Sequence, residues 1–334
     1  MALIGGGVFA AHAENEIREL ADLMQIPVIT TMMGISVFPD DDQLFCGMIG
    51  THGVKMANAA VNECDVLFLV GARVGDRAVK TPLALEKTTK IIHIDIDPAE
   101  IGKNIGADLP LVGDAKLVLQ QMTELAKPMK HDEWIAHIKT LGGERKYVEP
   151  AKGTVNPRVF IDRLAKKMPA NVTVVADVGQ NQIWTCTEYK FRKEGRLLTS
   201  GGMGTMGYSV PAAIGAKMAD NSRATVAICG DGAFQMSFME LATAVQFGVD
   251  IKVVVMTNNR LGMVRELQTN GYHDRQTAVF LDGSPDFIKL AEAYGIPAMR
   301  VYDDDTMDKG IEMLAEHKGI CLVEVVVDKD MPTL

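Results

Sequence analysis

Short runs of apolar, mostly β-branched residues alternate with segments of helical periodicity along nearly the whole chain. Such runs are typical of strands buried on both faces, and a helix between two of them lets the strands lie parallel. Strands are predicted at Leu3–Ile4, Pro27–Met32, Val66–Val70, Ile91–Asp95, Val172–Ala176, Ala224–Cys229, Ile251–Met256 and Ile320–Val327. Helices are expected near Phe9–Met24, Val54–Asn62, Ala115–Leu125, Arg158–Met168 and Phe234–Phe247. The alternation predicts an α/β fold with two doubly wound parallel-sheet domains.

The length of 334 residues suits about two domains, each with its own core. We expect the first α/β domain at residues 1–126 and the second at residues 157–334. Residues 127–156 are mostly polar and contain several glycine and proline residues, which is typical of a linker. One short helix is expected within this linker, around Trp134.

The charge and the cysteines argue against several classes of protein. The net charge is −9, the isoelectric point is near 5.3, and Lys and Arg do not cluster. Neither nucleic acid nor an anionic membrane surface is therefore expected as a partner. The five cysteines are scattered without a CxxC pair, and the chain has neither an apolar run of 18 residues nor a basic leader. These features favour a cytoplasmic protein.

Two predicted strands of the second domain end in residues suited to a magnesium ion on a diphosphate. Asp231, between two glycines, follows the strand 224–229, and Asn258 follows the next strand. Because the carboxyl ends of parallel strands meet at one edge of a sheet, we expect these two side chains to lie together. A carboxylate, an amide oxygen and a backbone carbonyl such as that of Arg260 are the hard oxygen ligands that Mg²⁺ prefers. A lone Gly-Asp-Gly also occurs in ordinary turns, so the prediction depends on the pairing of the two strand ends.

Two further loops of the second domain point to the same edge. Residues 177–182 follow a strand and open a helix, so the backbone amides and the side chains of Gln180 and Asn181 suit a phosphate. Residues 200–207 contain four glycines, which let a backbone approach a ring closely, and two methionines that add apolar bulk. A helix cap and a flexible turn are the plain alternatives for these two loops. Three such loops at one sheet edge favour a ligand site.

Together these motifs resemble those of acetohydroxyacid (acetolactate) synthase, a thiamine-diphosphate-dependent family of isoleucine and valine biosynthesis. The resemblance covers nearly all of the chain and rests on the segments 178–182, 200–207, 211–215, 230–234 and 258–264. It implies a central Rossmann-like domain followed by a C-terminal thiamine-diphosphate-binding domain. It also implies a transferase reaction, in which pyruvate is decarboxylated and its two-carbon unit is joined to a second 2-oxo acid.

The resemblance assigns the metal ligands of the second domain. It implies that Mg²⁺ is held by Asp231, by Asn258 and by the backbone of Arg260. Thr257 stands where the family has its first Asn, and Asn259 is the less suitable ligand.

The thiamine diphosphate site follows from the same resemblance. Met206 is implied as the apolar wedge that bends the cofactor, and the backbone of Gly204 as the acceptor of its aminopyrimidine. The implied cofactor residues are Gly179, Gln180, Asn181, Gly204, Met206, Gly230, Asp231, Gly232, Ala233, Asn258, Leu261, Gly262 and Met263.

The first domain resembles the family's central domain, which in many members holds FAD in a structural role. A glycine-rich turn suits a pyrophosphate, an acid at a strand end suits a ribose, and arginines suit a phosphate. The implied FAD residues are Gly5, Gly6, Gly7, Thr30, Thr31, Met32, His52, Gly71, Arg73, Asp76, Arg77, Asp95, Ile96, Gly113 and Asp114. The alternatives are an ordinary glycine loop and a flavin-free relative of the family.

Two residues depart from the family pattern. Asn181 stands where the family usually has His; an amide still donates to a phosphate, but it does not titrate near neutral pH. Leu267 stands where the family usually has the Trp that shapes the pocket for the second 2-oxo acid, so no preference for one acceptor is implied.

The largest departure concerns the family's N-terminal pyrimidine-binding domain, which carries the glutamate that protonates the aminopyrimidine. No counterpart of that domain is found in this chain, so no catalytic residue is assigned here and the chain alone is expected to be inactive. The tail after the last predicted strand is expected to be short. The family also implies a homo-oligomer, a dimer or tetramer, with or without a regulatory subunit. The rival hypotheses are another thiamine-diphosphate 2-oxo acid decarboxylase or carboligase, and a non-catalytic cofactor-binding fragment.

Overall fold

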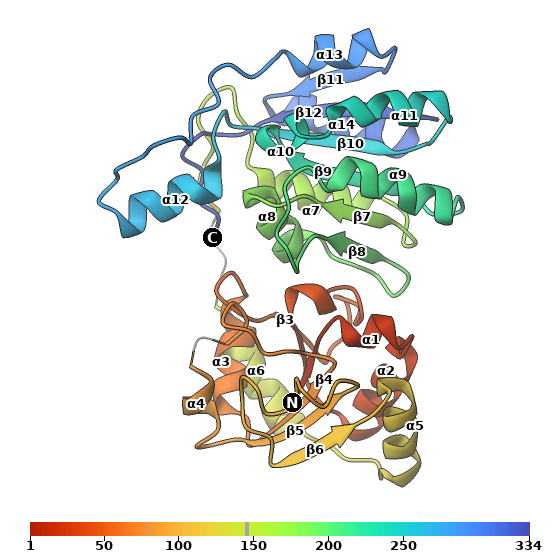
Figure 1. Ribbon diagram of the computed structural model, residues 1–334, viewed down its shortest axis with the longest axis vertical. Helices are drawn as coiled ribbons and strands as arrows, with labels where there is room; N and C mark the ends of the chain where they lie inside the picture. Colours follow the sequence, from red (N-terminus) through yellow and green to blue (C-terminus); the bar gives the residue numbers. More distant parts are fainter. Residues whose placement is uncertain (80, 144–146) are drawn as a thin grey trace. The chain divides into compact units, whose positions relative to one another are not determined.

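The computed structural model describes residues 1–79, 81–143 and 147–334 (Figure 1). The chain divides into two compact units, Met1–Arg145 and Lys146–Leu334, and each is an α/β sandwich of its own. Both sheets have six strands, and every strand pairing in them is parallel. The predicted fold class is confirmed.

The first sheet has the strand order β3-β2-β1-β4-β5-β6. The chain winds outward from β1 in one direction and then returns to continue from β4 in the other, so the topological switch point lies between β1 and β4. In chain order the strands are β1 (Ala2–Ile4), β2 (Val28–Thr30), β3 (Phe45–Met48), β4 (Val66–Val70), β5 (Lys90–Asp95) and β6 (Leu109–Val112).

Helices cover both faces of this sheet, because alternate strand residues enter two separate apolar clusters. Leu3, Leu69 and Ile91 pack in one cluster with residues of α3 and α6, whereas Ile4 and Val70 pack in the other with residues of α2 and α5. The helices are α1 (Gly7–Ala10), α2 (Glu14–Met24), the 3₁₀ turn η1 (Met32–Gly34), α3 (Lys55–Glu63), α4 (Pro82–Leu85), α5 (Ala115–Leu125) and α6 (Asp132–Thr140).

The second sheet has the order β11-β12-β10-β9-β7-β8, with its switch point between β7 and β9. Its strands are β7 (Thr173–Ala176), β8 (Arg196–Thr199), β9 (Thr225–Gly230), β10 (Lys252–Thr257), β11 (Ala298–Val301) and β12 (Cys321–Val326). The three central strands β7, β9 and β10 are almost completely buried, as their apolar β-branched sequences predict.

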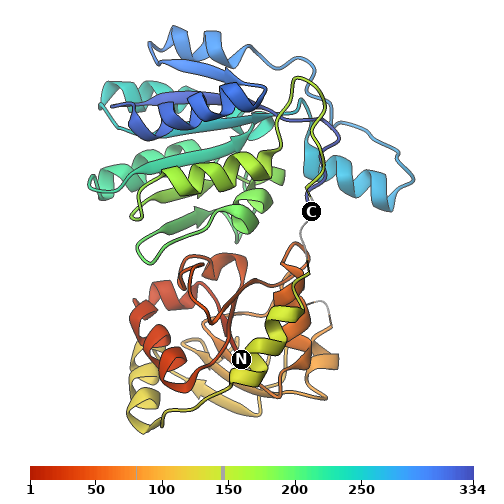
Figure 2. The same cartoon turned by 180° about the vertical axis from the view of Figure 1, so that it is seen from behind.

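The helices of the second unit also lie on both faces of its sheet. They are α7 (Pro157–Lys167), α8 (Gln180–Glu188), α9 (Ser209–Ala219), α10 (Asp231–Gln235), the 3₁₀ turn η2 (Phe238–Glu240), α11 (Leu241–Gln246), α12 (Gly262–Gly271), α13 (Phe287–Ala293) and α14 (Asp304–Glu316). Residues of α9, α11 and α13 share one apolar cluster with the sheet. Helices α7 and α14 pack against each other on the opposite face, which Figure 2 presents to the viewer.

The structure differs from the sequence-based expectation in three ways. The four strands absent from the prediction, β3, β6, β8 and β11, are the four edge strands of the two sheets. The helix expected over Phe9–Met24 is two helices, because His12 adopts a left-handed φ of 51° between them. The helix expected over Phe234–Phe247 is divided into α10, η2 and α11.

The boundary between the units also lies elsewhere than expected. The short helix predicted around Trp134 is α6, but it packs on α3 and buries Ile138 in the core of the first unit. Most of the stretch expected to be a linker therefore belongs to the first unit. No helix within the described residues is long and apolar enough to cross a membrane.

Candidate cofactor site

Three neighbouring strands of the second sheet, β7, β9 and β10, end at one edge beside the switch point. A pocket of about 110 Å³ opens there. Every residue in the predicted thiamine diphosphate set lines it except Gly204, and so does the predicted metal residue Arg260. Gly204 instead lies on the exposed loop 200–205 with a φ of 66°. The three loops singled out in the sequence therefore belong to one edge of one sheet.

Asp231 is the buried carboxylate of this pocket. It is 2% exposed, one side-chain oxygen accepts from the Gly232 amide at 2.8 Å, and the other accepts from the amides of Asn258 and Asn259 at 3.2 and 2.6 Å. Burial raises the pKa of Asp231 to about 6, against the opposing effect of these three amides. The carboxylate thus ties the end of β9 to the end of β10, and its cost of burial decreases when a cation lies beside it.

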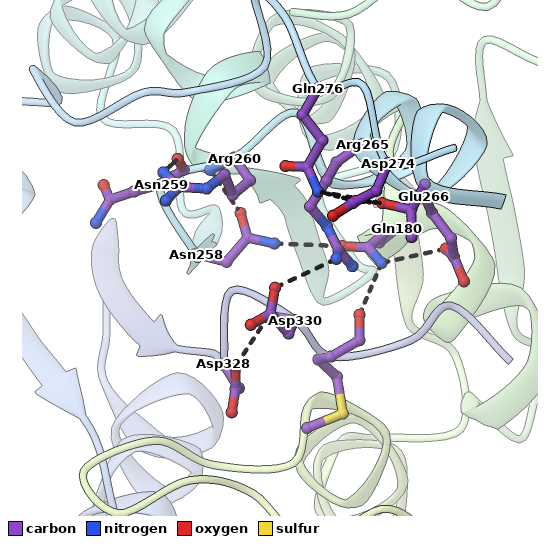
Figure 3. Close-up of polar contacts among 12 residues, drawn as sticks. Gln180, Asn258, Asn259, Arg260, Arg265, Glu266, Asp274, Gln276, Asp328 and Asp330 are labelled. Atoms are coloured by element: carbon purple, nitrogen blue, oxygen red, sulfur yellow. Dashed lines mark hydrogen bonds and ion pairs between the residues drawn. The ribbon is translucent and has the colours of Figure 1, made fainter. Parts of the chain in front are cut away.

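Asn258 and Asn259 point in different directions, as Figure 3 shows. The Asn258 side chain lines the pocket, accepts from the Arg260 amide at 3.0 Å through Oδ1, and donates to Gln180 through Nδ2 at 3.2 Å. Asn259 is exposed, and its φ of 54° turns the chain sharply after β10. Of the two amides, Asn258 alone presents an oxygen toward the pocket.

Arg260 adds the one cationic side chain among the described residues that line the pocket. Its guanidinium is held at the rim, because it donates to Asp282 at 2.8 Å and lies over the Phe280 ring. Its backbone amide lies beside the Asn258 side chain and donates to Oδ1.

Gln180 and Asn181 begin α8 but have different surroundings. The Gln180 amide nitrogen donates to the carbonyl of Met331 at 2.9 Å and to the hydroxyl of Thr333 at 3.1 Å. The Asn181 amide nitrogen donates to the carbonyls of Asp177 and Ile228, so it joins the ends of β7 and β9. The Asn181 donors predicted to reach a phosphate are thus engaged with the backbone.

Two glycines of the site are required by close contacts between its loops. A Cβ on Gly262 would lie 1.9 Å from Oε1 of Gln180, and a Cβ on Gly232 would lie 2.8 Å from the Leu261 side chain. Real Cβ atoms do not approach so closely, so any larger residue displaces a pocket side chain.

The few polar side chains of this mostly apolar pocket include oxygen ligands suited to a hard cation. Within the described ranges no group of three or more His, Cys, Asp or Glu side chains is placed to hold a metal. Asp231, Asn258 and a backbone carbonyl instead offer a partial oxygen shell, which suits Mg²⁺ completed by phosphate oxygens and water.

In the first unit, the predicted FAD residues lie along the carboxyl edge of the sheet. Gly5–Gly7 follow β1, Thr30–Met32 end or follow β2, Gly71 follows β4 and Gly113 follows β6. The backbones at Gly5, Gly7 and Gly71 approach so closely that none of these positions has room for a Cβ. A Cβ on Gly5 would lie 2.1 Å from the Gly71 carbonyl oxygen, and a Cβ on Gly7 would lie 2.6 Å from the Gly71 Cα. The two turns thus pack together at the switch point.

The other predicted FAD residues differ in their exposure. Arg73, Asp76, Arg77 and Ile96 are exposed, Asp95 is half-buried, and Asp114 caps α5 by accepting from the Leu117 amide. Thr30 is fully buried, and its hydroxyl has no hydrogen-bond partner among the residues that the structure describes.

Known protein families match both units. The thiamine pyrophosphate enzyme C-terminal TPP binding domain matches residues 177–325, and the thiamine pyrophosphate enzyme central domain matches residues 1–122. The chain belongs to the thiamine pyrophosphate enzymes.

Curated relatives of this thiamine pyrophosphate enzyme carry acetolactate synthase names. The "Probable acetolactate synthase large subunit" of Methanocaldococcus jannaschii is 40% identical over 98% of this chain and 57% of its own length. The "Acetolactate synthase large subunit" of Lactococcus lactis is 35% identical over the same shares. That of Corynebacterium glutamicum is 40% identical over 98% of this chain and 54% of its own. The chain thus spans a little over half the length of these relatives.

Some residues that shape the pocket lie outside the predicted set. Asp177 is fully buried at the end of β7; it accepts from the amides of Gly207 at 3.0 Å and Ser209 at 2.8 Å, and so pins the glycine-rich loop to the sheet. An acid directly after a predicted buried strand is a sequence signal that could have identified it. Trp184 lines the pocket and donates to the Pro332 carbonyl, a contact that no local pattern predicts.

Proposed function

We propose that the second unit binds thiamine diphosphate by its diphosphate, with Mg²⁺ held by Asp231, Asn258 and the Arg260 carbonyl. The observation that carries the proposal is the buried Asp231 carboxylate at the switch point, which accepts from the backbone amide of Asn258 at the neighbouring strand end and shares the pocket with its side chain. The amide of Ala233, in the first turn after β9, supplies a donor for a phosphate oxygen, whereas the Gly232 amide donates to Asp231 at 2.8 Å.

The remaining pocket residues suit the apolar part of the cofactor. Met206 packs against the apolar core, and its Cε lies 3.4 Å from the Cβ position of Gly232. Leu261 and Met263 add apolar surface on the α12 side. These side chains exclude water around a bound ring and orient it against the loop 200–207.

We further propose an acetolactate synthase type of reaction, in which pyruvate is decarboxylated and its two-carbon unit is joined to a second 2-oxo acid. Bound thiamine diphosphate supplies the nucleophilic carbon and the electron sink for this chemistry. The names of the relatives support this substrate class over other thiamine-diphosphate carboligases or decarboxylases. Leu267, which is 65% exposed on α12, favours a pocket open to more than one acceptor.

Calorimetry tests the cofactor assignment directly. Wild-type chain titrated with thiamine diphosphate in the presence of Mg²⁺ is expected to bind, and Asp231→Ala is expected to bind at least about tenfold more weakly because it loses the charged ligand. Asp282→Ala, which removes an exposed carboxylate at the pocket rim, is the matched control. Equal affinity of Asp231→Ala and wild type would mean that the metal lies elsewhere. Product analysis with pyruvate, alone and with 2-oxobutyrate, then separates a carboligase from a decarboxylase.

For the first unit we propose FAD at the carboxyl edge of the sheet. The buried, unpartnered Thr30 hydroxyl and the exposed cations Arg73 and Arg77 at the same edge support it. Chain mixed with FAD and passed through gel filtration is expected to stay yellow, and Arg73→Ala is expected to lose colour. Lys87→Ala, an exposed cation just before β5 and so at the opposite edge, is the control. Colourless wild-type protein with intact folding would favour the flavin-free branch of the family.

We also propose that the chain acts in a homo-oligomer. The second unit exposes large apolar side chains on and around α10 and α11, namely Met236, Met239, Val245 and Phe247. Side chains of this kind are common in subunit interfaces. Light scattering is expected to give at least a dimer, and Phe247→Asp is expected to shift it toward the monomer. A wild-type chain that is monomeric by light scattering would contradict this part of the proposal. Any regulatory subunit would in that case bind a monomer of this chain.

A further inference from the structure

A row of hydrogen bonds leads from Glu266 of α12 through Gln180 to Asn258 in the pocket (Figure 3), and Nε2 of Gln180 lies 3.4 Å from a Glu266 carboxylate oxygen. Thr333 joins Glu266 and Gln180 by a second route. Glu266 of α12 accepts from the Thr333 amide at 3.2 Å through one oxygen and contacts the Thr333 hydroxyl through the other. Nε2 of Gln180 donates to that hydroxyl oxygen at 3.1 Å, and Nδ2 of Asn258 donates to Oε1 of Gln180 at 3.2 Å. The row therefore ends on a predicted metal ligand.

Glu266, at the outer end of this row, determines which group donates and which accepts in each of its hydrogen bonds. A carboxylate accepts only, so the single hydroxyl proton of Thr333 goes to Glu266 and the hydroxyl oxygen is left to accept from Gln180. Gln180 must then turn its oxygen toward Asn258, and Asn258 must turn its NH₂ toward Gln180. The Asn258 oxygen is thereby left facing the Arg260 amide and the pocket.

The burial of the row makes this direction stable. Gln180 is 4% exposed and Thr333 is 2% exposed, so water does not compete for the amide or the hydroxyl. The Met331 carbonyl, which is also an obligate acceptor, demands the same orientation of Gln180 at 2.9 Å. The Met331 carbonyl, the Thr333 hydroxyl and the Glu266 carboxylate, which lies 3.4 Å from Nε2, therefore all favour the same orientation of the Gln180 amide.

We propose that Glu266 is a positioning residue for the cation: through Thr333 and Gln180 it holds Asn258 with its oxygen, and not its nitrogen, toward the metal. The inference rests on the proposed Mg²⁺ site, and the Arg260 amide, which donates to the Asn258 oxygen at 3.0 Å, favours the same orientation. Mg²⁺ accepts oxygen ligands, and an NH₂ group in the same place cannot ligate it. Because the Met331 carbonyl supports the same orientation, loss of Glu266 weakens the metal site without abolishing it.

The test measures how much Mg²⁺ is needed for half-maximal binding of thiamine diphosphate to the 334-residue chain, by the fluorescence of Trp184 and by calorimetry. Glu266→Gln places an NH₂ group beside the Thr333 hydroxyl. Thr333→Val removes that hydroxyl and keeps a side chain of nearly the same shape. Both are expected to raise the half-saturating Mg²⁺ concentration about tenfold. At saturating Mg²⁺ the thiamine diphosphate affinity is expected to return to within about twofold of wild type, because the cation then selects the oxygen-facing orientation.

Two variants serve as controls. Thr333→Ser keeps the hydroxyl and is expected to retain the wild-type Mg²⁺ requirement. Asp330→Asn alters the same segment where it pairs with Arg265 at 3.3 Å, outside the row, and is expected to be neutral.

An unchanged Mg²⁺ requirement in both Glu266→Gln and Thr333→Val would overturn the inference. So would a loss of affinity that persists at saturating Mg²⁺ and accompanies a lower unfolding temperature of the ligand-free chain, since that pattern marks a purely structural role. Absence of any Mg²⁺-dependent binding in the wild type is a different result: it would remove the proposed function itself, and the inference with it.

Discussion

At the scale of single residues, the free-energy cost of burying the charged Asp231 carboxylate favours the binding of a cation in the site. Burial raises its pKa, and three backbone amides recover only part of the lost hydration. A carboxylate in this state gains from a divalent cation, so the same burial that destabilises it in the free chain favours metal binding. The sequence shows the acid at the strand end, but its burial and its three amide partners come only from the fold.

A pH dependence follows from this pKa. The metal binds the charged carboxylate, whose fraction is nearly complete well above pH 6 and falls about tenfold per pH unit below it. Mg²⁺-dependent affinity for thiamine diphosphate is therefore expected to fall about tenfold between pH 7.5 and pH 5. Calorimetry at both values measures it, with Mg²⁺ binding to free thiamine diphosphate as the control, because the diphosphate itself takes up protons. A difference no larger than in that control would contradict the assignment of the titration to Asp231.

Gly262 gives a second prediction at this scale. In Gly262→Ala the new methyl group would lie 1.9 Å from Gln180 Oε1, so Gln180 must leave its hydrogen bond with Asn258. Thiamine diphosphate affinity is expected to fall about tenfold, with a loss of about 1–3 kcal/mol in the free energy of unfolding. Gly215→Ala is the matched control, because a Cβ at this α9 position meets no atom within 4 Å. It is expected to be neutral or slightly stabilising. Tolerance of both substitutions would show that the pocket adapts.

At the scale of secondary-structure elements, what the sequence predicts depends on burial. The central strands β7, β9 and β10 are predicted because strands buried on both faces are continuous apolar runs. The edge strands β6 and β11 are missed because they are short and half-exposed and so carry no such run. That Asp231 and Asn258 lie in one pocket could be predicted because both directly follow central strands. The hydrogen-bond partners of Gln180 could not be predicted from the sequence, because Glu266 and residues 331–333 come close to Gln180 only in the folded chain.

The Asp177 contacts lead to a prediction about the glycine-rich loop. Asp177→Ala leaves the buried amides of Gly207 and Ser209 without their acceptor, which is expected to lower the free energy of unfolding by about 3 kcal/mol. The amides of both residues are expected to exchange with deuterium faster than in wild type. Asp220→Ala, at the other end of α9, removes an exposed acceptor of Ser222 and is expected to cost less than about 1 kcal/mol. Similar exchange in the two variants would mean that other contacts hold the loop.

At the scale of the whole molecule, each unit has its own sheet and core, and each carries its own part of the proposed chemistry. Each has a six-stranded sheet, helices on both faces and its own switch point. The pocket of the second unit offers donors, oxygen ligands and apolar surface, yet Asp231 is the one carboxylate among the described residues that line it. In the proposed site that carboxylate holds the cation, so the described residues that line the pocket present no second acid for proton transfer.

The last prediction is that the 334-residue chain by itself forms acetolactate slowly. A positioned general acid or base contributes about 10²–10⁴-fold, and no pocket carboxylate other than Asp231 is available for that role among the described residues. Chain supplied with pyruvate, Mg²⁺, thiamine diphosphate and FAD is therefore expected to be at least about a hundredfold slower than the same chain mixed with the N-terminal part of a curated relative. Acetolactate is measured in both, with Asp231→Ala as the background. Rapid product formation by the chain alone would point to Glu266 at the pocket rim as an acid, and Glu266→Gln would then abolish turnover rather than alter the Mg²⁺ requirement.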